Sequence, residues 1–180
     1  MKLPDSSITK KALAGALKEL MEAESFSKIS ISDICEKCDM NRKSFYYHFK
    51  DKYDLVNWIF DTEFITVMNK EGYTIGWDSL ELLSDYFYKN RIFYRKALDV
   101  TGQNSFSDHF HDLMFSAISV RLQEIMDMQA MSTFQVNFFT DAVVQAFQRW
   151  IMDKNCMPPE EFTSQLKQCI QYIAARYSYL

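Results

Sequence analysis

Apolar residues recur every three to four positions along most of the chain, which is the period of an amphipathic helix. Residues 6–24 carry such a stripe, made of Ile8, Ala12, Leu13, Ala16, Leu17, Leu20 and Met21. Further helical segments are expected at about residues 51–70, 78–88, 90–100, 106–127, 132–154 and 159–178. Asp51 and Asp78 are suitable N-caps for the first two of these, and Leu55, Ile59 and Val67 are expected to face inward. The 180 residues include only 4 Gly and 3 Pro, which favours long helices over strands. The pattern therefore predicts an all-α protein.

Two short helices are expected between residues 30 and 50. Ser30 and Asp33 have the spacing of a helix N-terminal capping box, so the first helix is predicted over residues 30–38. Residues 39–41 then allow a tight turn, and Asn41 is a suitable N-cap for a second helix. Two short helices separated by a three-residue turn are typical of a helix-turn-helix, in which the second helix enters the major groove of DNA.

The second short helix combines an apolar side with an outer side rich in hydrogen-bonding groups. Phe45 and Phe49 are four residues apart and are expected to face the core. The remaining positions carry cations, hydroxyls and an imidazole, which suit phosphates and base edges. These candidate DNA-binding residues are Arg42, Lys43, Ser44, Tyr46 and His48.

The run from Phe26 to Leu55 resembles the DNA-binding region of TetR/AcrR-type transcriptional regulators. Such regulators carry a hydroxyl residue at the start of the first helix, an aromatic-rich recognition helix, and a lysine shortly before a leucine in the next helix. Ser30, Tyr46, Phe49, Lys52 and Leu55 stand at these positions. The chain departs from the pattern at the turn glycine, which is Asp39 here, and at two small residues, which are Cys35 and Cys38.

The resemblance implies a three-helix helix-turn-helix DNA-binding domain at residues 1–52 and a larger helical effector-binding and dimerisation domain at 53–180. We expect Arg42 and Lys43 to contact base edges or nearby phosphates of double-stranded DNA. Ser30, Ser44, Tyr46, His48 and Lys52 would fix position on the DNA backbone. Lys52 lies in the first turn of a helix, where a cation gains nothing from the helix dipole, so an external phosphate would suit it.

Residues 90–98 and 102–106 resemble the C-terminal domain of a subset of these regulators that includes the dihydroxyacetone-kinase operon activator. The C-terminal part is rich in aromatic residues, which could line an effector pocket between helices or simply fill a core and a dimer interface. The candidates for the pocket are Tyr86, Tyr94, Phe110, Phe115, Phe138 and Trp150.

The last two predicted helices carry apolar faces that one protomer would leave uncovered. On the first of them the face comprises Phe134, Phe138, Phe139, Val143, Phe147 and Trp150; on the second it comprises Leu166, Ile170 and Ile173. In the resembled family two such helices meet their copies in a four-helix interface. A homodimer would place two recognition helices at successive major grooves, as an inverted-repeat operator requires. The alternative is a helical hairpin buried within one monomer.

The net charge of −4 is unevenly distributed. Residues 1–52 hold 10 Lys and Arg against 8 Asp and Glu, a net charge of +2, and residues 53–180 carry −6. This modest N-terminal excess agrees with local phosphate contacts, and an acidic remainder would suppress non-specific DNA binding. The chain has no apolar run long enough to span a membrane and no secretion signal at its start, so we expect a cytoplasmic protein.

No catalytic motif stands out, so an enzyme is not expected, and neither is a cofactor or a bound metal. Cys35 and Cys38 could form a redox or zinc site but fit buried core thiols better. His109 and His111 are two residues apart and fall on different helix faces, which is poor geometry for a shared metal. Two rival functions stay open: a coactivator-dependent interaction protein in which DNA binding is secondary, and, with less support, a helical small-molecule-binding enzyme.

Overall fold

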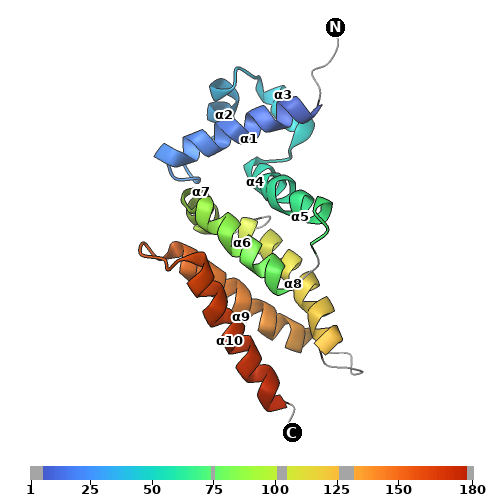
Figure 1. Cartoon of the computed structure of the whole chain (residues 1–180). Helices are drawn as coiled ribbons and strands as arrows, with labels where there is room; N and C mark the ends of the chain where they lie inside the picture. The colour runs from blue at the N-terminus through green and yellow to red at the C-terminus, as the bar shows by residue number, and fades with distance from the viewer. Residues whose placement is uncertain (1–5, 74–75, 101–104, 126–131, 178–180) are drawn as a thin grey trace. The chain divides into compact units, whose positions relative to one another are not determined.

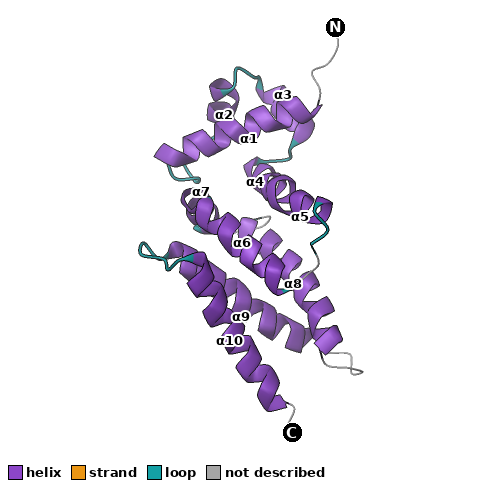
Figure 2. Cartoon of the chain, viewed as in Figure 1, coloured by secondary structure: helices purple, strands orange, loops and turns teal. Residues whose placement is uncertain are grey.

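The computed structural model describes residues 6–73, 76–100, 105–125 and 132–177, and every regular element within these ranges is a helix (Figure 1, Figure 2). This confirms the predicted all-α fold. None of the helices in the described ranges has the length and apolarity needed to cross a membrane. The helices are α1 (Ser6–Ala23), α2 (Ile31–Lys37), α3 (Arg42–His48), α4 (Lys52–Phe60), η1 (Asp61–Ile65), α5 (Thr66–Lys70), α6 (Trp77–Lys89), α7 (Arg91–Leu98), α8 (Phe106–Ile125), α9 (Thr133–Met152) and α10 (Pro159–Tyr177).

The chain divides into two compact units. The first contains the chain up to Thr66 together with Ile92–His109, and the second contains Val67–Arg91 together with the chain from Phe110 onward. The N-terminal unit thus includes the three-helix region, all of α4 and η1, most of α7 and the first residues of α8. The predicted boundary at residue 52 divides the chain by expected function, DNA binding before it and effector binding after it. It does not coincide with the boundary of a compact unit, and it stays a prediction.

Local side-chain chemistry explains where the short helices begin. The Ser30 backbone N–H donates to the Asp33 carboxylate (2.7 Å), and the Asp33 N–H donates to the Ser30 hydroxyl (3.2 Å). This is the predicted capping box, and the bond from the Ser30 backbone lowers the pKa of Asp33. Asn41 caps α3 by accepting from the Ser44 N–H at 2.9 Å, and Asp51 caps α4 by accepting from two backbone N–H groups. All three caps were predicted from the sequence.

The turn between α2 and α3 is a Schellman motif. The Met40 N–H donates to the Cys35 carbonyl (2.8 Å) and the Asp39 N–H to the Glu36 carbonyl (3.3 Å), which satisfies two carbonyls at the end of α2. The motif requires a left-handed residue, and Asp39 takes that conformation with φ of +53°. Asp39 is the one non-glycine residue with positive φ in the described part of the chain. The turn geometry is therefore retained without the usual glycine.

The helix after α3 was predicted to continue to about Lys70 with Val67 facing inward, and this second point is wrong. Helical structure does extend that far, but residues 61–65 form a π-helical turn. A π turn inserts one extra residue, so every later side chain is displaced around the helix axis. Phe64 is buried, whereas Val67 is 45% exposed.

Phe60 is the centre of an aromatic cluster in the N-terminal unit. Its ring stacks on Phe64 at 5.4 Å and meets Tyr94 of α7 and Phe106 of α8 edge to face at 6.2 and 5.4 Å. The Lys96 ammonium donates to the Glu22 carbonyl at the end of α1 (3.1 Å). These contacts explain why parts of α7 and α8 pack with the helices that precede Thr66.

The C-terminal unit is built around α6, α9 and α10. The rings of Trp150 and Phe162 stack at 4.2 Å with an angle of 3° between their planes. The Thr163 and Ser84 hydroxyls meet at 3.0 Å in the buried contact of α10 with α6. Asp78 was expected to cap α6, but the helix begins at Trp77 with Gly76 as its N-cap, and the Ser79 hydroxyl accepts from the Gly76 N–H (2.9 Å).

Exchanging Asp39 tests the strain in the α2–α3 turn. Asp39→Val should lower the free energy of unfolding by about 1–2 kcal/mol, because a β-branched side chain is strongly disfavoured at positive φ. Asp39→Gly should leave it unchanged or raise it by up to about 1 kcal/mol, since glycine relieves the strain but gains freedom in the unfolded chain. Chemical denaturation measures both. Equal stability of the two variants would contradict the Schellman geometry.

Candidate nucleic-acid interface

The inner side of α3 is fixed by two phenylalanines. Phe45 is 0% exposed and Phe49 is also buried, as the sequence predicted. The Phe49 ring meets Trp58 of α4 edge to face at 5.7 Å, and the Lys10 ammonium of α1 lies 5.5 Å from the centre of the same Phe49 ring. A helix of seven residues is not stable alone, so these contacts are what hold α3 in place.

The outer side of α3 is open to solvent. Arg42 and Lys43 are exposed, and 51% of Tyr46 and 78% of Tyr47 is accessible. The Arg42 Nη2 donates to the Tyr46 hydroxyl at 3.4 Å, and the guanidinium carbon lies 5.9 Å from the centre of the Tyr46 ring. Cations and hydroxyls thus stand together on the side of α3 that the core does not use.

Two of the predicted contacts are already engaged in helix caps. The Ser30 hydroxyl accepts from the Asp33 N–H, and the Ser44 hydroxyl donates to the Asn41 side-chain oxygen (3.2 Å). Both serines therefore shape the ends of α2 and α3. A contact of either hydroxyl with a phosphate would have to form beside the existing cap bond.

His48 is half-buried at the end of α3. Its ring meets the rings of Tyr47 (4.9 Å) and Phe49 (6.4 Å). Burial lowers the pKa of His48, and repulsion from Lys10 lowers it further. A histidine with a pKa below its usual value of about 6.5 is mostly neutral at pH 7. His48 is thus placed to act as a hydrogen-bonding group rather than as a cation.

Lys52 donates to backbone carbonyls of its own chain. Its ammonium donates to the carbonyls of Phe26 (2.7 Å), Ser27 (3.3 Å) and Ile29 (2.7 Å) in the segment between α1 and α2. The ammonium also lies 4.6 Å from the centre of the Phe26 ring. Three donors meet three acceptors, so this geometry argues against the phosphate contact expected from the sequence. Burial lowers the pKa of Lys52, as this position implies.

Tyr47 was not among the predicted contacts, although it is the most exposed aromatic residue of α3 in the structure. A positional signal existed in the sequence. Tyr47 follows Lys43 by four residues, so helical geometry places the two on one outward strip next to Arg42 and Tyr46. Tyr46 stands at a position of the family motif, whereas its neighbour Tyr47 does not.

The paired cysteines lie in the unit core rather than at a reactive surface. Cys35 is buried, Cys38 is half-buried, and both are free thiols. Burial raises the pKa of each. The Cys38 thiol donates to the Ile34 carbonyl at 3.2 Å. Because a raised pKa keeps both thiols neutral, the two cysteines fit a structural role in the core better than a redox or metal site.

The six residues proposed for an effector pocket do not share one environment. Tyr94 belongs to the N-terminal unit, where it is fully buried against Phe60, Phe93 and Phe106, and the other five belong to the C-terminal unit. Within that unit Phe110 and Trp150 are packed in the core, Tyr86 and Phe115 are half-buried, and Phe138 is 60% exposed. Core packing therefore accounts for the buried members of the set.

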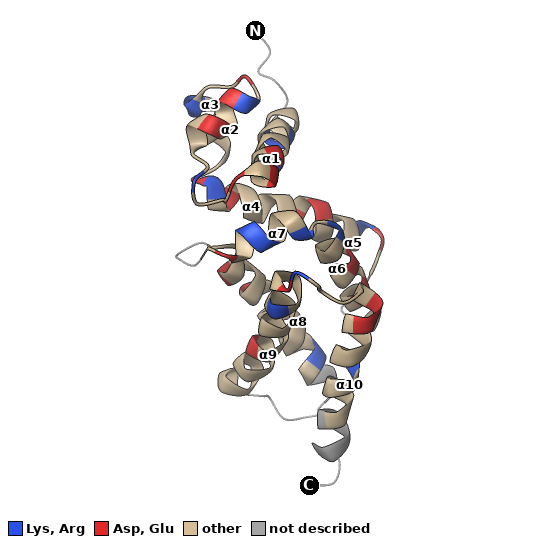
Figure 3. Cartoon of the chain, turned by 90° about the vertical axis from the view of Figure 1, so that its left-hand side faces the viewer, with Lys and Arg blue, Asp and Glu red and all other residues tan. Residues whose placement is uncertain are grey.

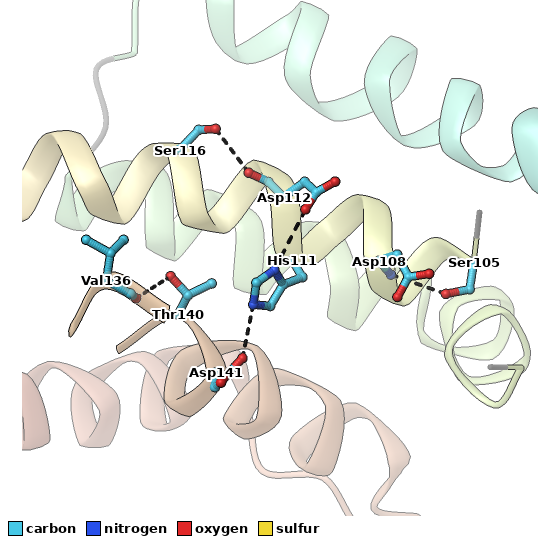
Figure 4. A network of polar contacts seen from close by, with 8 residues as sticks. All are labelled: Ser105, Asp108, His111, Asp112, Ser116, Val136, Thr140 and Asp141. Atoms are coloured by element: carbon cyan, nitrogen blue, oxygen red, sulfur yellow. Dashed lines mark hydrogen bonds and ion pairs between the residues drawn. The ribbon is translucent and has the colours of Figure 1, made fainter. Parts of the chain in front are cut away.

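The two neighbouring histidines serve different partners. His109 pairs with Asp61 of η1 at 2.8 Å in the N-terminal unit. In the C-terminal unit His111 lies between Asp112 of its own helix α8 and Asp141 of α9, with Nε2 3.0 Å from the Asp141 carboxylate (Figure 4). No group of three metal-binding side chains occurs among the residues that the structure describes.

Charge alone does not mark the interface. Lys and Arg are interspersed with Asp and Glu over α1 and α2 (Figure 3), whereas α3 contains no Asp or Glu. Lys37 of α2 pairs with Glu19 of α1 at 3.0 Å, and Lys18 of α1 pairs with Glu63 of η1 at 2.6 Å. These lysines are compensated, whereas Arg42 and Lys43 project without an acidic partner among the described residues. The positive charge of α3 itself is therefore uncompensated.

Two capped short helices, a Schellman turn and an exposed second helix define a helix-turn-helix transcriptional regulator. Residues 13–59 match the family described as bacterial regulatory proteins of the tetR family, and residues 77–172 match a family described as a transcriptional regulator C-terminal region. The chain belongs to the TetR family. It is a DNA-binding transcriptional regulator, as the sequence predicted, and members of this family are regulators and not enzymes.

Individual relatives agree with this assignment. The chain is 32% identical over 121 residues to the HTH-type dhaKLM operon transcriptional activator DhaS of Lactococcus lactis, an alignment that covers 66% of this chain and 65% of that protein. A solved structure of the dihydroxyacetone kinase operon activator DhaS has 26% identity and a TM-score of 0.68 over 93% of this chain and 97% of its own. The expected likeness to this subset is confirmed.

More distant structures share the fold. A TetR transcriptional regulator from Streptococcus agalactiae is 19% identical, with a TM-score of 0.67 over 95% of this chain and 94% of its own. NalD, described as the secondary repressor of the MexAB-OprM multidrug efflux pump in Pseudomonas aeruginosa, is 16% identical, with a TM-score of 0.63 over 93% of this chain and 97% of its own. At such identities the likeness concerns the fold alone.

Replacing Lys52 distinguishes an internal tie from a phosphate contact. Lys52→Met should lower the free energy of unfolding by about 2 kcal/mol, because hydrogen bonds to a charged group are lost and three carbonyls are left without their donor. The slope of log affinity against log salt concentration, measured with DNA, should stay the same, since no phosphate contact is removed.

Lys43→Met is the matched control for this experiment. Lys43 is exposed, so the change should alter stability by no more than about 0.5 kcal/mol. It should reduce the salt slope by about one if Lys43 neutralises a phosphate. A reduced salt slope for Lys52→Met at unchanged stability would restore the original assignment of Lys52.

Proposed function

We propose that the chain acts as a homodimer that binds an inverted-repeat operator and is controlled by a ligand or partner at its C-terminal helices. The observation that carries the proposal is the two-sided character of α3. Phe45 and Phe49 are buried, while Arg42, Lys43, Tyr46 and Tyr47 project into solvent. A helix held on one side and equipped with cations and hydroxyls on the other can enter the major groove.

A second copy is the partner that we propose for the exposed apolar side chains of α9 and α10. Phe134 is 78% and Phe138 is 60% exposed on α9, and Tyr172 of α10 is exposed as well. Burying one phenylalanine side chain contributes roughly 1.5–3 kcal/mol, so two symmetric sets would favour association. The monomer buries Phe147 and Trp150 itself, which divides the predicted apolar face into an internal part and a part left for the partner.

Control of DNA binding is proposed to reach α3 through the C-terminal helices. A small-molecule effector or a protein coactivator could act there, provided that it binds two arrangements of the dimer with different affinity. The relative named as an activator of the dhaKLM operon supports activation rather than repression as the first hypothesis for this chain. We also propose that the protein acts in the cytoplasm, since its proposed target is DNA.

Selection of DNA fragments by the purified protein tests the proposal. The selected sequences should contain two inverted half-sites whose centres are about one helical turn, roughly 34–36 Å, or a multiple of it apart. Sedimentation of the complex should give two chains per site. Selection of single half-sites, or retention of promoter DNA only after a second protein is added, would favour the interaction-protein alternative.

A charge placed on the exposed face of α9 tests the dimer. Phe138→Asp should shift the protein to monomer in sedimentation equilibrium and weaken operator binding by at least about tenfold, because one subunit alone spans only half of the site. Ile92→Asp is the control, since Ile92 is exposed on α7 and outside α9 and α10. Dimers that persist in Phe138→Asp would exclude this part of α9 from the interface.

A further inference from the structure

The outer side of α3 consists of two parallel rows, each with a cation followed by a tyrosine four residues later. One row is Arg42 and Tyr46, and the other is Lys43 and Tyr47. The rows differ in their internal contacts. Arg42 and Tyr46 are joined by the 3.4 Å bond from Nη2 to the hydroxyl, whereas the Tyr47 ring meets His48 and no bond to Lys43 is present in the described part of the chain.

We infer that Arg42 binds a guanine in the major groove and that the Tyr46 hydroxyl positions the Arg42 guanidinium for this contact. The inference rests on the proposed function, since it requires α3 to lie in the groove. It goes further by naming the base and by giving the two side chains distinct roles. Arg42 touches the base, and Tyr46 acts through Arg42 as a positioning residue.

The choice of guanine follows from the donor and acceptor pattern of the base edges. A guanidinium carries five N–H donors and no acceptor. Guanine presents two adjacent acceptors, N7 and O6, in the major groove, whereas adenine presents N7 beside an N6 donor. The bond to Tyr46 occupies one Nη2 N–H and leaves the remaining donors for a two-point contact. Lys43, a point charge without this fork, suits a phosphate better.

Tyr46 is well placed to hold Arg42 because it is itself anchored. The Tyr46 ring meets the fully buried Phe45 ring edge to face at 5.7 Å. The guanidinium carbon lies 5.9 Å from the centre of the Tyr46 ring, so the ring supports the arginine in addition to the hydroxyl. A bond of 3.4 Å is weak by itself, but two constraints together restrict a long side chain. Restriction before binding reduces the ordering cost of the complex.

The experiment uses the full-length protein and an operator selected by it, with each guanine of the half-site replaced in turn. At one position, exchange of G·C for A·T should weaken wild-type binding about 5- to 150-fold. Substitution of 7-deazaguanine at that position removes only N7, and it should weaken binding by a smaller factor of about five. Fluorescence anisotropy at fixed salt concentration measures each affinity.

The variants assign this discrimination to particular atoms. Arg42→Ala should bind the two operators of the deaza pair within about twofold of each other, and Arg42→Lys should do the same although it keeps the charge. Tyr46→Phe removes only the hydroxyl, and it should weaken binding to the natural operator about two- to fivefold with little change on the deaza operator. Tyr47→Phe, the matched control in the other row, should keep the wild-type ratio between the two operators.

Three results would overturn the inference while leaving the proposed function intact. They are a selected operator without a guanine in its half-sites, an Arg42→Ala protein that still discriminates against 7-deazaguanine, and a Tyr46→Phe protein with the wild-type ratio. Failure of the wild-type protein to select any inverted-repeat DNA would instead overturn the proposed function together with the inference. Circular dichroism verifies that each variant is folded.

Discussion

The position of α3 in the N-terminal unit depends on the burial of Phe45. A helix as short as α3 is not stable in isolation, because nucleation costs more than two turns of hydrogen bonds return. Phe45 is completely removed from solvent, and Phe49 extends the contact to Trp58 of α4. Since the inner side is held, the outer side can present Arg42 and Tyr46 in a defined direction. Recognition then requires little further ordering of the backbone.

Three local devices determine how this short helix is oriented. The left-handed Asp39 ends α2 and reverses the chain, and Asn41 starts α3 two residues later. Lys52 then joins the start of α4 to the segment between α1 and α2 through three carbonyls. The lysine thus serves the same end as the phenylalanines, because it stabilises the frame around α3. A movement of α4 would have to carry this segment with it or break those bonds.

The features that depend on neighbours in sequence could be predicted, and those that depend on distant packing could not. The caps at Ser30, Asn41 and Asp51 follow from side-chain chemistry within three residues. The π turn in η1 leaves no comparable local signal, and for that reason Val67 was assigned to the wrong side. The internal bonds of Lys52 could not be predicted because its acceptors are carbonyls 23 to 26 residues away, which a sequence pattern does not display. Aromatic content alone cannot separate a cavity from a core, so the sequence could not show that Phe110 and Trp150 are buried while Phe138 is exposed.

Protection of tyrosines by operator DNA tests whether α3 lies in the major groove. Hydroxyl-radical footprinting of the protein reports the solvent accessibility of each tyrosine with and without DNA. Tyr46 and Tyr47 should lose reactivity when the operator binds, while Tyr73 and Tyr172, which are exposed outside α3, should keep the reactivity that they have in the free protein. Unchanged reactivity of Tyr46 and Tyr47 in a saturated complex would contradict the placement of α3 in the groove.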